Sequence, residues 1–364
     1  MRIAYAINSM EGGGAQTPLP KIVRALEKAG ATVRIMALTR RNGLAVERLG
    51  AAGIEPLVRD GGEKDQLAAH RWLCDRTREW GADAIWTSLT RATLLGQMVG
   101  RRLGIPVVSW QHNAYLKPWN ERLLRWRAGY TDLWVADSEQ VAALTRERLG
   151  VSAGTLVTWP IFAAEPDAPH ARPWRAGETM QIGSLGRLHP NKGYDVLIDA
   201  LAIMHAFPAT PKASYRVAIA GTGADEAKLL ARARARGVEM IEFAGFTRDA
   251  KEFLSGLHLY LQPSRREGFC IAVHEAMQAG LPVIVTRTGE MPHTVNSPAI
   301  GRVVKVADPH SLAKALAELL DAPQSLAAMG RAARDRVLER FSQDRFETTG
   351  AEIVRRIETL ISRH

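Results

Sequence analysis

The chain has 364 residues, 46% of them hydrophobic and 24% charged, a balance typical of a folded protein rather than a disordered one. This length exceeds what one compact core usually serves, so the sequence predicts two domains. The formal net charge of +10 favours anionic partners. Residues 1–170 contain 22 basic and 17 acidic side chains and residues 171–364 contain 26 and 21, so each half carries +5. Because no basic tail or arm stands out, nucleic acid is not expected among the partners.

Neither a membrane span nor a disulfide framework is predicted. No run of about 18 apolar residues occurs that would cross a bilayer. The N-terminal segment is followed too quickly by glycines for a signal peptide, and we interpret it as a first strand. Cys74 and Cys270 are too few for a disulfide framework and lack metal-ligand spacing. A reducing, cytoplasmic location is therefore expected.

Short apolar segments alternate with longer amphipathic ones in the first half, a pattern that predicts a parallel sheet covered by helices. The predicted strands are residues 3–7, 33–37, 84–86, 107–110 and 133–136. Helices are predicted between them, for example over residues 67–80 and 93–103. A stretch rich in Pro and Ala, residues 160–177, is the predicted linker.

The same pattern restarts after the linker. The predicted strands are residues 180–185, 215–220, 240–243, 257–261 and 283–286, and the predicted helices are residues 194–205, 226–236, one that contains Glu275, and most of the chain from Asp308 on. The last helical region breaks at Phe341 and Ser342. We therefore predict an α/β protein with two Rossmann-like, doubly wound parallel-sheet domains that face each other across a cleft, the expected site. The predicted domains are residues 1–165 and 178–342, with residues 343–364 as a helix that packs back on the first domain.

Two carboxylates, Glu267 and Glu275, stand eight residues apart around a predicted strand–loop–helix junction. Gly268 allows a ligand to approach the backbone closely, and the amides from Gly268 to Ile271 lie at a predicted helix N-terminus. Such amides favour an anionic or hydroxyl-rich ligand, and carboxylates offer two acceptors to sugar hydroxyls. The alternative is that Glu267 caps the helix and Glu275 is a buried polar residue bonded to backbone.

A basic loop, residues 183–193, follows the first strand of the second half and contains Arg187 and Lys192 five residues apart. Both side chains can converge on one anion. Two fixed cations placed where charge builds on a departing diphosphate would stabilise the transition state more than the ground state. The alternative is a solvated basic loop.

In order along the chain, Gly-Arg187-Leu-x3-Lys192-Gly, Gly221-Thr-Gly223, and Glu267-x7-Glu275-Ala-Met followed by Gly-Leu-Pro-Val resemble glycosyltransferase family 4, which has the GT-B architecture. The resemblance covers nearly the whole second half. In the first half, the glycines at residues 12–14 resemble the N-terminal glycine loop of the family. The helix break at Phe341 resembles its C-terminal helices.

The resemblance implies a role for each matching residue. Arg187 and Lys192 would bind the donor diphosphate, Glu267 the donor sugar, and Glu275 the nucleotide ribose. Further donor contacts are implied for the two glycine-containing loops, at Gly13, Gly14, Gly268, Phe269, Cys270 and Ile271. The family generally retains the anomeric configuration, and the leaving phosphate, rather than a protein base, helps to deprotonate the acceptor.

His112, after the predicted strand 107–110, matches the place where relatives carry a histidine near the donor sugar. A structural histidine is the alternative. Three positions near the first strand depart from the family pattern: Gln16 stands where a glutamate is usual, and Pro18 and Pro20 would disturb the start of the first helix. Cys270 replaces a common glycine, and we expect it to pack as a small buried residue.

A basic and aromatic stretch, residues 117–127, predicts an acceptor or membrane surface. At helical spacing its aromatic residues share a face with arginines beside it, and the residues concerned are Trp119, Arg122, Arg125, Trp126 and Arg127. Such a helix would grip a lipid-linked acceptor or contact an anionic membrane from the cytoplasmic side. The alternative places both tryptophans in the core and leaves the arginines in water.

Together these features predict a retaining glycosyltransferase that moves a sugar from a nucleotide diphosphate-sugar to a glycan or lipid-linked acceptor in polysaccharide or glycolipid synthesis. No cofactor and no metal are expected, since no Asp-x-Asp pair and no cluster with metal-ligand spacing occurs. Two alternatives stay open: a sugar-nucleotide epimerase of similar shape, and a non-catalytic subunit that binds a sugar nucleotide. Neither the donor base, the sugar nor the acceptor can be predicted.

Overall fold

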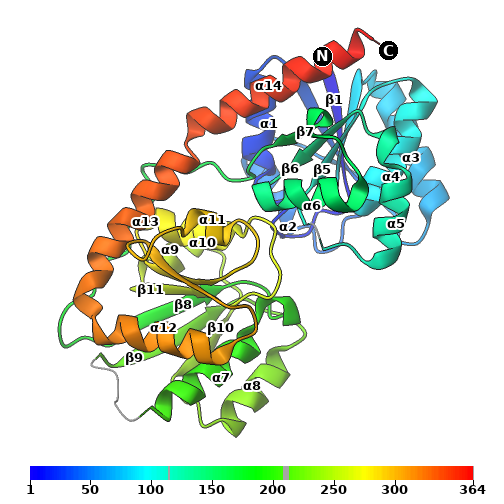
Figure 1. Cartoon of the computed structure of the whole chain (residues 1–364). Helices are drawn as coiled ribbons and strands as arrows, with labels where there is room; N and C mark the ends of the chain where they lie inside the picture. Colours follow the sequence, from blue (N-terminus) through cyan, green and yellow to red (C-terminus); the bar gives the residue numbers. More distant parts are fainter. Residues whose placement is uncertain (114, 208–212, 364) are drawn as a thin grey trace. The chain divides into compact units, whose positions relative to one another are not determined.

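The computed structural model describes residues 1–113, 115–207 and 213–363, and it divides into two compact units. The first comprises Met1–Ala163 together with Gln343–His364, and the second is Ala164–Ser342. Each unit contains one parallel sheet with helices around it (Figure 1). This confirms the predicted α/β class with two parallel-sheet domains. The chain passes from one unit to the other within the predicted linker and again at the predicted helix break.

The sheet of the first unit has seven strands in the order β3-β2-β1-β4-β5-β6-β7. Its strands are β1 (Arg2–Ile7), β2 (Thr32–Ala37), β3 (Leu57–Val58), β4 (Ala84–Ser88), β5 (Val107–Gln111), β6 (Leu133–Ala136) and β7 (Leu156–Thr158). Every residue of β4, β5 and β6 is buried, as expected of central parallel strands with both faces covered. The edge strands β3 and β7 were not predicted because two or three residues carry no periodic pattern.

Seven α-helices belong to the described part of the first unit: α1 (Leu19–Lys28), α2 (Leu44–Ala51), α3 (Gln66–Trp80), α4 (Thr90–Leu103), α5 (Pro118–Trp126), α6 (Glu139–Leu149) and α14 (Gln343–Ile361). The expectation that Pro18 and Pro20 would disturb the first helix needs correction. The helix α1 begins at Leu19, and Pro20 lies in its first turn. Proline is tolerated there because the first amides of a helix have no intrahelical acceptor.

The helix α14 packs on α1 of the first unit. The indole Nε1 of Trp159 donates a hydrogen bond of 3.0 Å to the carbonyl of Phe346, and the two rings lie 4.9 Å apart. Close approach is possible because Gly350 has no side chain: a Cβ there would lie 3.1 Å from the Trp159 ring and 3.4 Å from Ala25. Burial of these groups holds the C-terminal helix against the first unit.

The sheet of the second unit has six strands in the order β10-β9-β8-β11-β12-β13. They are β8 (Met180–Leu185), β9 (Tyr215–Ala220), β10 (Ile241–Gly245), β11 (Leu259–Gln262), β12 (Val283–Thr286) and β13 (Gly301–Val304). The α-helices are α7 (Tyr194–His205), α8 (Glu226–Ala235), α9 (Ala250–Ser255), α10 (Ile271–Gln278), α11 (Met291–Thr294), α12 (Pro309–Asp321) and α13 (Leu326–Arg340). The strand order reverses between the neighbours β8 and β11, so the loops that follow these two strands meet at a topological switch point.

Candidate functional site

Two of the predicted site residues meet at the switch point of the second unit. Lys192 ends the short 3-10 helix Pro190–Lys192 after β8, and Glu267 lies in the loop after β11. The Lys192 Nζ donates to the Glu267 Oε1 over 2.7 Å, although 75 residues separate them in sequence. Ligands of doubly wound sheets bind outside the strand ends at such a point. The fold therefore places this ion pair where a ligand is expected.

Lys192 keeps its positive charge in this position. Its side chain is 22% exposed and that of Glu267 is 10% exposed. Burial by itself lowers the pKa of the Lys192 ammonium, but the charge of Glu267, its hydrogen bond and the neighbouring groups together outweigh burial, so that the pKa is raised overall. A charged, partly shielded ammonium interacts with an anion more strongly than a solvated one, because less water screens it.

A chain of hydrogen bonds from buried residues in and just after β11 orients Glu267. The hydroxyl of Ser264 donates to the Glu267 Oε1 over 2.6 Å, and Gln262 Nε2 donates to the Ser264 Oγ over 2.8 Å. The Tyr260 hydroxyl donates to Gln262 Oε1 over 2.8 Å, and it accepts from the amide of Leu185 over 3.1 Å. Burial raises the pKa of Tyr260, so the phenol stays protonated as a donor. The chain orients the carboxylate and links the ends of β8 and β11.

Sequence reasoning gave no role to Tyr260, Gln262 or Ser264. All three lie in or just after β11, and all three are fully buried. An apolar strand with a tyrosine and a glutamine is ordinarily interpreted as core. The sequence signal that could have identified these residues is the polar pair Gln262 and Ser264 at the carboxyl end of a buried strand, because buried polar groups need hydrogen-bond partners.

Arg187 is exposed in the loop after β8, and it forms no hydrogen bond or ion pair with any residue that the structure describes. Gly221 holds this loop in place. A Cβ on Gly221 would lie 2.0 Å from the carbonyl oxygen of Gly186, and one on Gly223 would lie 2.2 Å from that of Leu188. The Gly-x-Gly motif therefore supports the backbone beside Arg187.

Gly193 and Arg265 fasten the Lys192 loop to the loop after β11. Gly193 has a φ of +69°, and a Cβ there would lie 2.1 Å from the carbonyl oxygen of Pro263. The Arg265 guanidinium donates two hydrogen bonds of 2.7 Å to the carboxylate of Asp195, and its amide donates to the Asn191 carbonyl over 2.7 Å. Paired guanidinium–carboxylate contacts of this kind fix orientation as well as distance.

The loop after Glu267 turns sharply into α10. Cys270 has a φ of +66°, a left-handed conformation that is uncommon for a residue other than glycine. The backbone N–H groups of Gly268, Cys270 and Ile271 have no acceptor among the described residues. Unpaired amides at a helix N-terminus favour a negatively charged or oxygen-rich ligand. Glu275 lies half-buried on the second turn of the same helix.

Two side chains of this loop are enclosed. The ring of Phe269 stacks on His274, 4.0 Å between centroids, and meets the edge of Phe341 at 5.1 Å. The Cys270 thiol is buried, and burial raises its pKa, which keeps it neutral and unreactive. Because both side chains are enclosed, only the backbone of these two residues is available to a ligand.

His274 braces the loop and was not predicted to have a role. Its Nδ1 is paired with the Cys270 carbonyl at 2.9 Å, and its Nε2 with the Thr294 hydroxyl at 3.0 Å. The ring is fully buried, and burial lowers its pKa to about 3. A neutral imidazole with both nitrogens bonded is a structural support for the turn that precedes Glu275.

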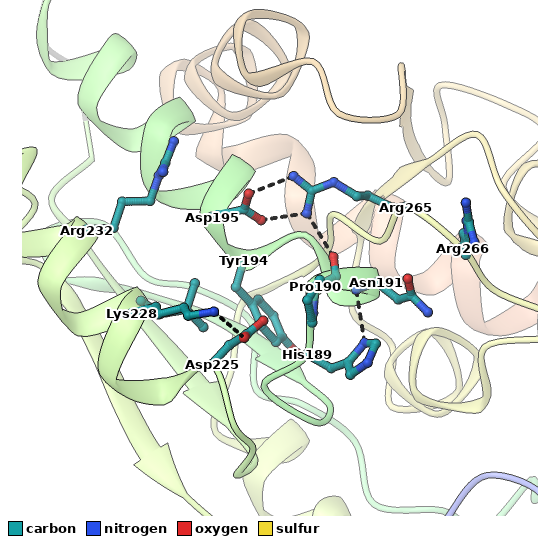
Figure 2. Close-up of a pocket in the computed structure, with 11 residues that line it drawn as sticks. His189, Pro190, Asn191, Tyr194, Asp195, Asp225, Lys228, Arg232, Arg265 and Arg266 are labelled. Carbon is teal, nitrogen blue, oxygen red and sulfur yellow. Dashed lines mark hydrogen bonds and ion pairs between the residues drawn. The ribbon is translucent and has the colours of Figure 1, made fainter.

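A cleft of about 530 Å³ lies beside the Lys192 loop, between that loop and α8 (Figure 2). The residues that line it are His189, Pro190, Asn191, Tyr194, Asp195, Asp225, Lys228, Leu229, Arg232, Arg265 and Arg266. Its two acids are paired with cations: Asp195 with Arg265, and Asp225 with Lys228 at 3.9 Å. Lys192 and Glu267 do not line it, so this cleft is separate from the ion pair at the switch point.

The glycine loop of the first unit follows β1. The carbonyl of Gly13 accepts hydrogen bonds from the amides of Gln16 and Thr17, and a Cβ on Gly14 would meet nothing within 4 Å. The side chain of Gln16 is buried and donates to the Ser9 carbonyl over 3.1 Å. Gln16 thus stabilises the loop from within, a role that explains a neutral amide at this position.

His112 lies at the carboxyl edge of the first unit's sheet. Its side chain is 7% exposed. Its Nε2 lies 3.0 Å from the Ser88 hydroxyl, its Nδ1 lies 3.6 Å from a carboxylate oxygen of Asp137, and its ring stacks on Trp110. Both ring nitrogens therefore face groups of the first unit.

The helix α5 presents both tryptophans to solvent. Trp119 is 72% exposed and Trp126 is 74% exposed, whereas Leu124 is the residue of α5 that is buried. The alternative that the tryptophans belong to the core is therefore wrong. Arg122 and Arg125 are also exposed. Arg127 differs, because its side chain donates to Gln97 Oε1 over 3.0 Å and lies over the Tyr130 ring.

Within the described residues, no group of three or more His, Cys, Asp or Glu side chains is arranged to hold a metal ion. None of the helices described there has the length and apolar character required to cross a bilayer.

Two family profiles match the chain in succession. The one described as Glycosyltransferase Family 4 matches residues 12–162, and the one described as Glycosyl transferases group 1 matches residues 171–336. The chain belongs to glycosyltransferase family 4. It is of the GT-B type, as the sequence motifs predicted, and its enzyme class is that of the hexosyltransferases.

One relative and one solved structure resemble the chain along most of its length. The phosphatidyl-myo-inositol mannosyltransferase of Mycobacterium leprae is 28% identical and covers 95% of this chain and 89% of its own. A GDP-mannose-dependent monoacylated alpha-(1-6)-phosphatidylinositol monomannoside mannosyltransferase of Corynebacterium glutamicum is 36% identical, but the match spans 45% of this chain and 44% of that protein. The Anabaena protein HepE, solved with UDP-glucose, shares the fold with a TM-score of 0.85 at 20% identity, over 98% of this chain and 100% of that one.

Burial of neutral His274 makes the stability of the fold depend on pH. The unfolded ring binds a proton below its ordinary pKa of about 6.5, whereas the folded ring stays neutral down to about 3. This contribution to stability is therefore complete above about pH 6.5 and is lost as the pH falls towards 3. Denaturant unfolding from pH 7 to pH 4 should show a slope about 1.4 kcal/mol per pH unit steeper in the wild type than in His274→Gln. Parallel curves would contradict this assignment.

Proposed function

We propose that the chain transfers a hexosyl group from a nucleotide diphosphate-sugar to a lipid-linked or glycan acceptor, with retention of the anomeric configuration and without a metal ion. The observation that carries this proposal is the Lys192–Glu267 pair at the switch point, with Arg187 and the unpaired amides of α10 on the same edge of the sheet. Cations, an acid and helix amides in one place suit a diphosphate joined to a sugar.

A nucleotide diphosphate-hexose is the donor class that the relatives support. The Corynebacterium glutamicum relative is named for its dependence on GDP-mannose, and HepE was solved with UDP-glucose. These donors differ in base and sugar, but both consist of a nucleoside diphosphate and a hexose. A site built on two cations and a helix N-terminus recognises the part that they share.

In the proposed reaction, Arg187 and Lys192 bind the diphosphate and stabilise the charge that develops as it leaves. Glu267 accepts a hydrogen bond from a sugar hydroxyl, and Glu275 accepts from the ribose. The bond between the anomeric carbon and the phosphate oxygen breaks, and the acceptor oxygen bonds to that carbon on the same face. The acceptor proton passes to an oxygen of the leaving phosphate. We further propose that His112 hydrogen-bonds the donor sugar and that the glycine loop at Gly13 and Gly14 approaches its phosphates.

The exposed face of α5 supports a lipid-linked acceptor. Trp119 and Trp126 are large apolar side chains in water, and Arg122 and Arg125 lie exposed on the same short helix. Aromatic rings beside arginines suit the interface of an anionic membrane. The names of the mycobacterial and corynebacterial relatives describe acceptors of the phosphatidylinositol type. We propose that α5 brings the enzyme to such a surface.

The two alternatives are less well supported. The relatives described above are named as transferases, and none is an epimerase. A non-catalytic binding subunit would bind the donor without transferring or hydrolysing it, so turnover with an added acceptor separates it from the proposed enzyme.

Replacement of Lys192 or Glu267 tests the proposed site. Lys192→Ala and Glu267→Gln are each expected to lower kcat about 10²-fold, because Lys192 stabilises the departing diphosphate and Glu267 binds the sugar that is transferred. The rate is measured with a panel of sugar nucleotides and lipid acceptors. Lys228→Ala, which removes a lysine from the neighbouring cleft, is the matched control and should keep the wild-type rate. Wild-type turnover in both site variants would show that the reaction occurs elsewhere.

The proposed absence of a metal requirement has its own test. Since two side-chain cations would neutralise the diphosphate, transfer in EDTA should proceed within about twofold of the rate with added Mg²⁺ or Mn²⁺. A rate that disappears in EDTA and returns with one of these ions would refute a metal-independent reaction.

The membrane proposal is tested with vesicles that contain anionic phospholipid. Arg122→Glu/Arg125→Glu reverses two charges on α5 and should lower co-sedimentation at least about fivefold, because each basic residue near such a surface contributes about 1 kcal/mol. Arg234→Glu/Arg331→Glu changes the net charge equally at exposed positions of the second unit and should bind like the wild type. Equal binding by all three proteins would exclude the role of α5.

A further inference from the structure

Four polar side chains form a buried array across the first unit's sheet. Tyr5 lies in β1, Ser88 ends β4, His112 follows β5, and Asp137 follows β6. These strands are consecutive neighbours in the sheet, so the order of the sheet brings together residues up to 132 positions apart. The Tyr5 hydroxyl lies 2.7 Å from Ser88 Oγ, Ser88 Oγ lies 3.0 Å from His112 Nε2, and His112 Nδ1 lies 3.6 Å from Asp137 Oδ2.

Aromatic rings enclose this array. Trp110 stacks on the His112 ring with 5.2 Å between centroids, and Trp86 stacks on Tyr5 with 5.8 Å between centroids. Tyr5, Ser88 and Asp137 are each buried to within 1% of complete burial. In such surroundings a polar group that lacks a partner is costly, so the donors and acceptors of the array must match one another.

The carboxylate of Asp137 favours a proton on His112 Nδ1 through its charge, because its nearer oxygen lies 3.6 Å from that nitrogen, beyond hydrogen-bond distance but within the range of an ion pair. With this single proton on the ring, Nε2 is an acceptor, and the Ser88 hydroxyl must donate to it. The Ser88 oxygen in turn accepts from Tyr5. Burial raises the pKa of the Tyr5 phenol, so that the phenol keeps the proton that this direction requires.

We propose that Asp137 is a positioning residue that holds His112 in the Nδ1–H tautomer, with its Nε2 as an acceptor. This inference rests on the proposed function, in which His112 serves the donor sugar. An unprotonated Nε2 can accept a hydrogen bond from a sugar hydroxyl in place of the one from Ser88. It has no N–H to donate to a carboxylate. Asp137 therefore adapts the site to a neutral hexose rather than a hexuronic acid.

Asp137→Asn tests this role, because the amide has the size of the carboxylate but can also donate to Nδ1, which frees the other tautomer. We expect kcat to fall between about 10-fold and 100-fold, as when a group that orients a histidine is lost, while the KM for the donor stays within about twofold. Asp132→Asn is the matched control, since Asp132 immediately precedes β6 at its opposite end and accepts a hydrogen bond from the Val107 amide that an asparagine also accepts. It should keep wild-type turnover.

The tautomer itself is measured by ¹H–¹⁵N correlation of the His112 ring, a reading that needs no activity. The wild type and Asp132→Asn should show the Nδ1–H form, and Asp137→Asn should show a substantial Nε2–H population. An Nε2–H ring in the wild type, or wild-type turnover in Asp137→Asn, would overturn the inference. Failure of the wild type to transfer any sugar would instead refute the proposed function, because the tautomer would still be read. If Asp137→Asn does not fold, the tautomer measured for the His112 ring in the wild type decides whether the inference holds.

Discussion

The ion pair between Lys192 and Glu267 is the contact on which the second unit's site depends. It joins the loops after β8 and β11. After β8 the chain adds β9 and β10 on one side of this strand and then adds β11 on the other side, which makes β8 and β11 neighbours. All strands point the same way, so every loop that follows them lies at one edge, and the reversal at β8 and β11 leaves room between two of these loops. The hydrogen bonds from Tyr260 to Ser264 then fix the acid at that place. The result is a charged pair, held rigidly, beside amides that lack acceptors.

The first unit repeats this logic with different chemistry. Its strand order reverses between β1 and β4, and the buried array of Tyr5, Ser88, His112 and Asp137 crosses that point. In the second unit the polar groups end in a charged pair, whereas in the first they end in the imidazole of His112.

Much of this was predictable from sequence, and the exceptions have physical reasons. The motifs around Arg187, Lys192 and Glu267 follow strands that the apolar pattern identifies, so their position at one sheet edge could be expected. The strand β4 runs on to Ser88, two residues beyond its predicted end, because Thr87 and Ser88 are polar in sequence but buried and hydrogen-bonded in the fold. The array around His112 needs the order of four strands, which no local pattern encodes. Likewise, the pattern of α5 groups Trp119 with Trp126, but only the packing of Leu124 shows that this face is turned to solvent.

The central claim is that the loops after β8 and β11 of this glycosyltransferase receive the donor. A crystal structure with a bound nucleotide diphosphate-sugar tests it most directly. Our account predicts diphosphate oxygens within hydrogen-bonding distance of Lys192 Nζ and the Arg187 guanidinium, with the sugar at Glu267 and the amides of α10. A donor seated instead in the cleft beside Lys228, with Lys192 and Glu267 still paired only to each other, would contradict it.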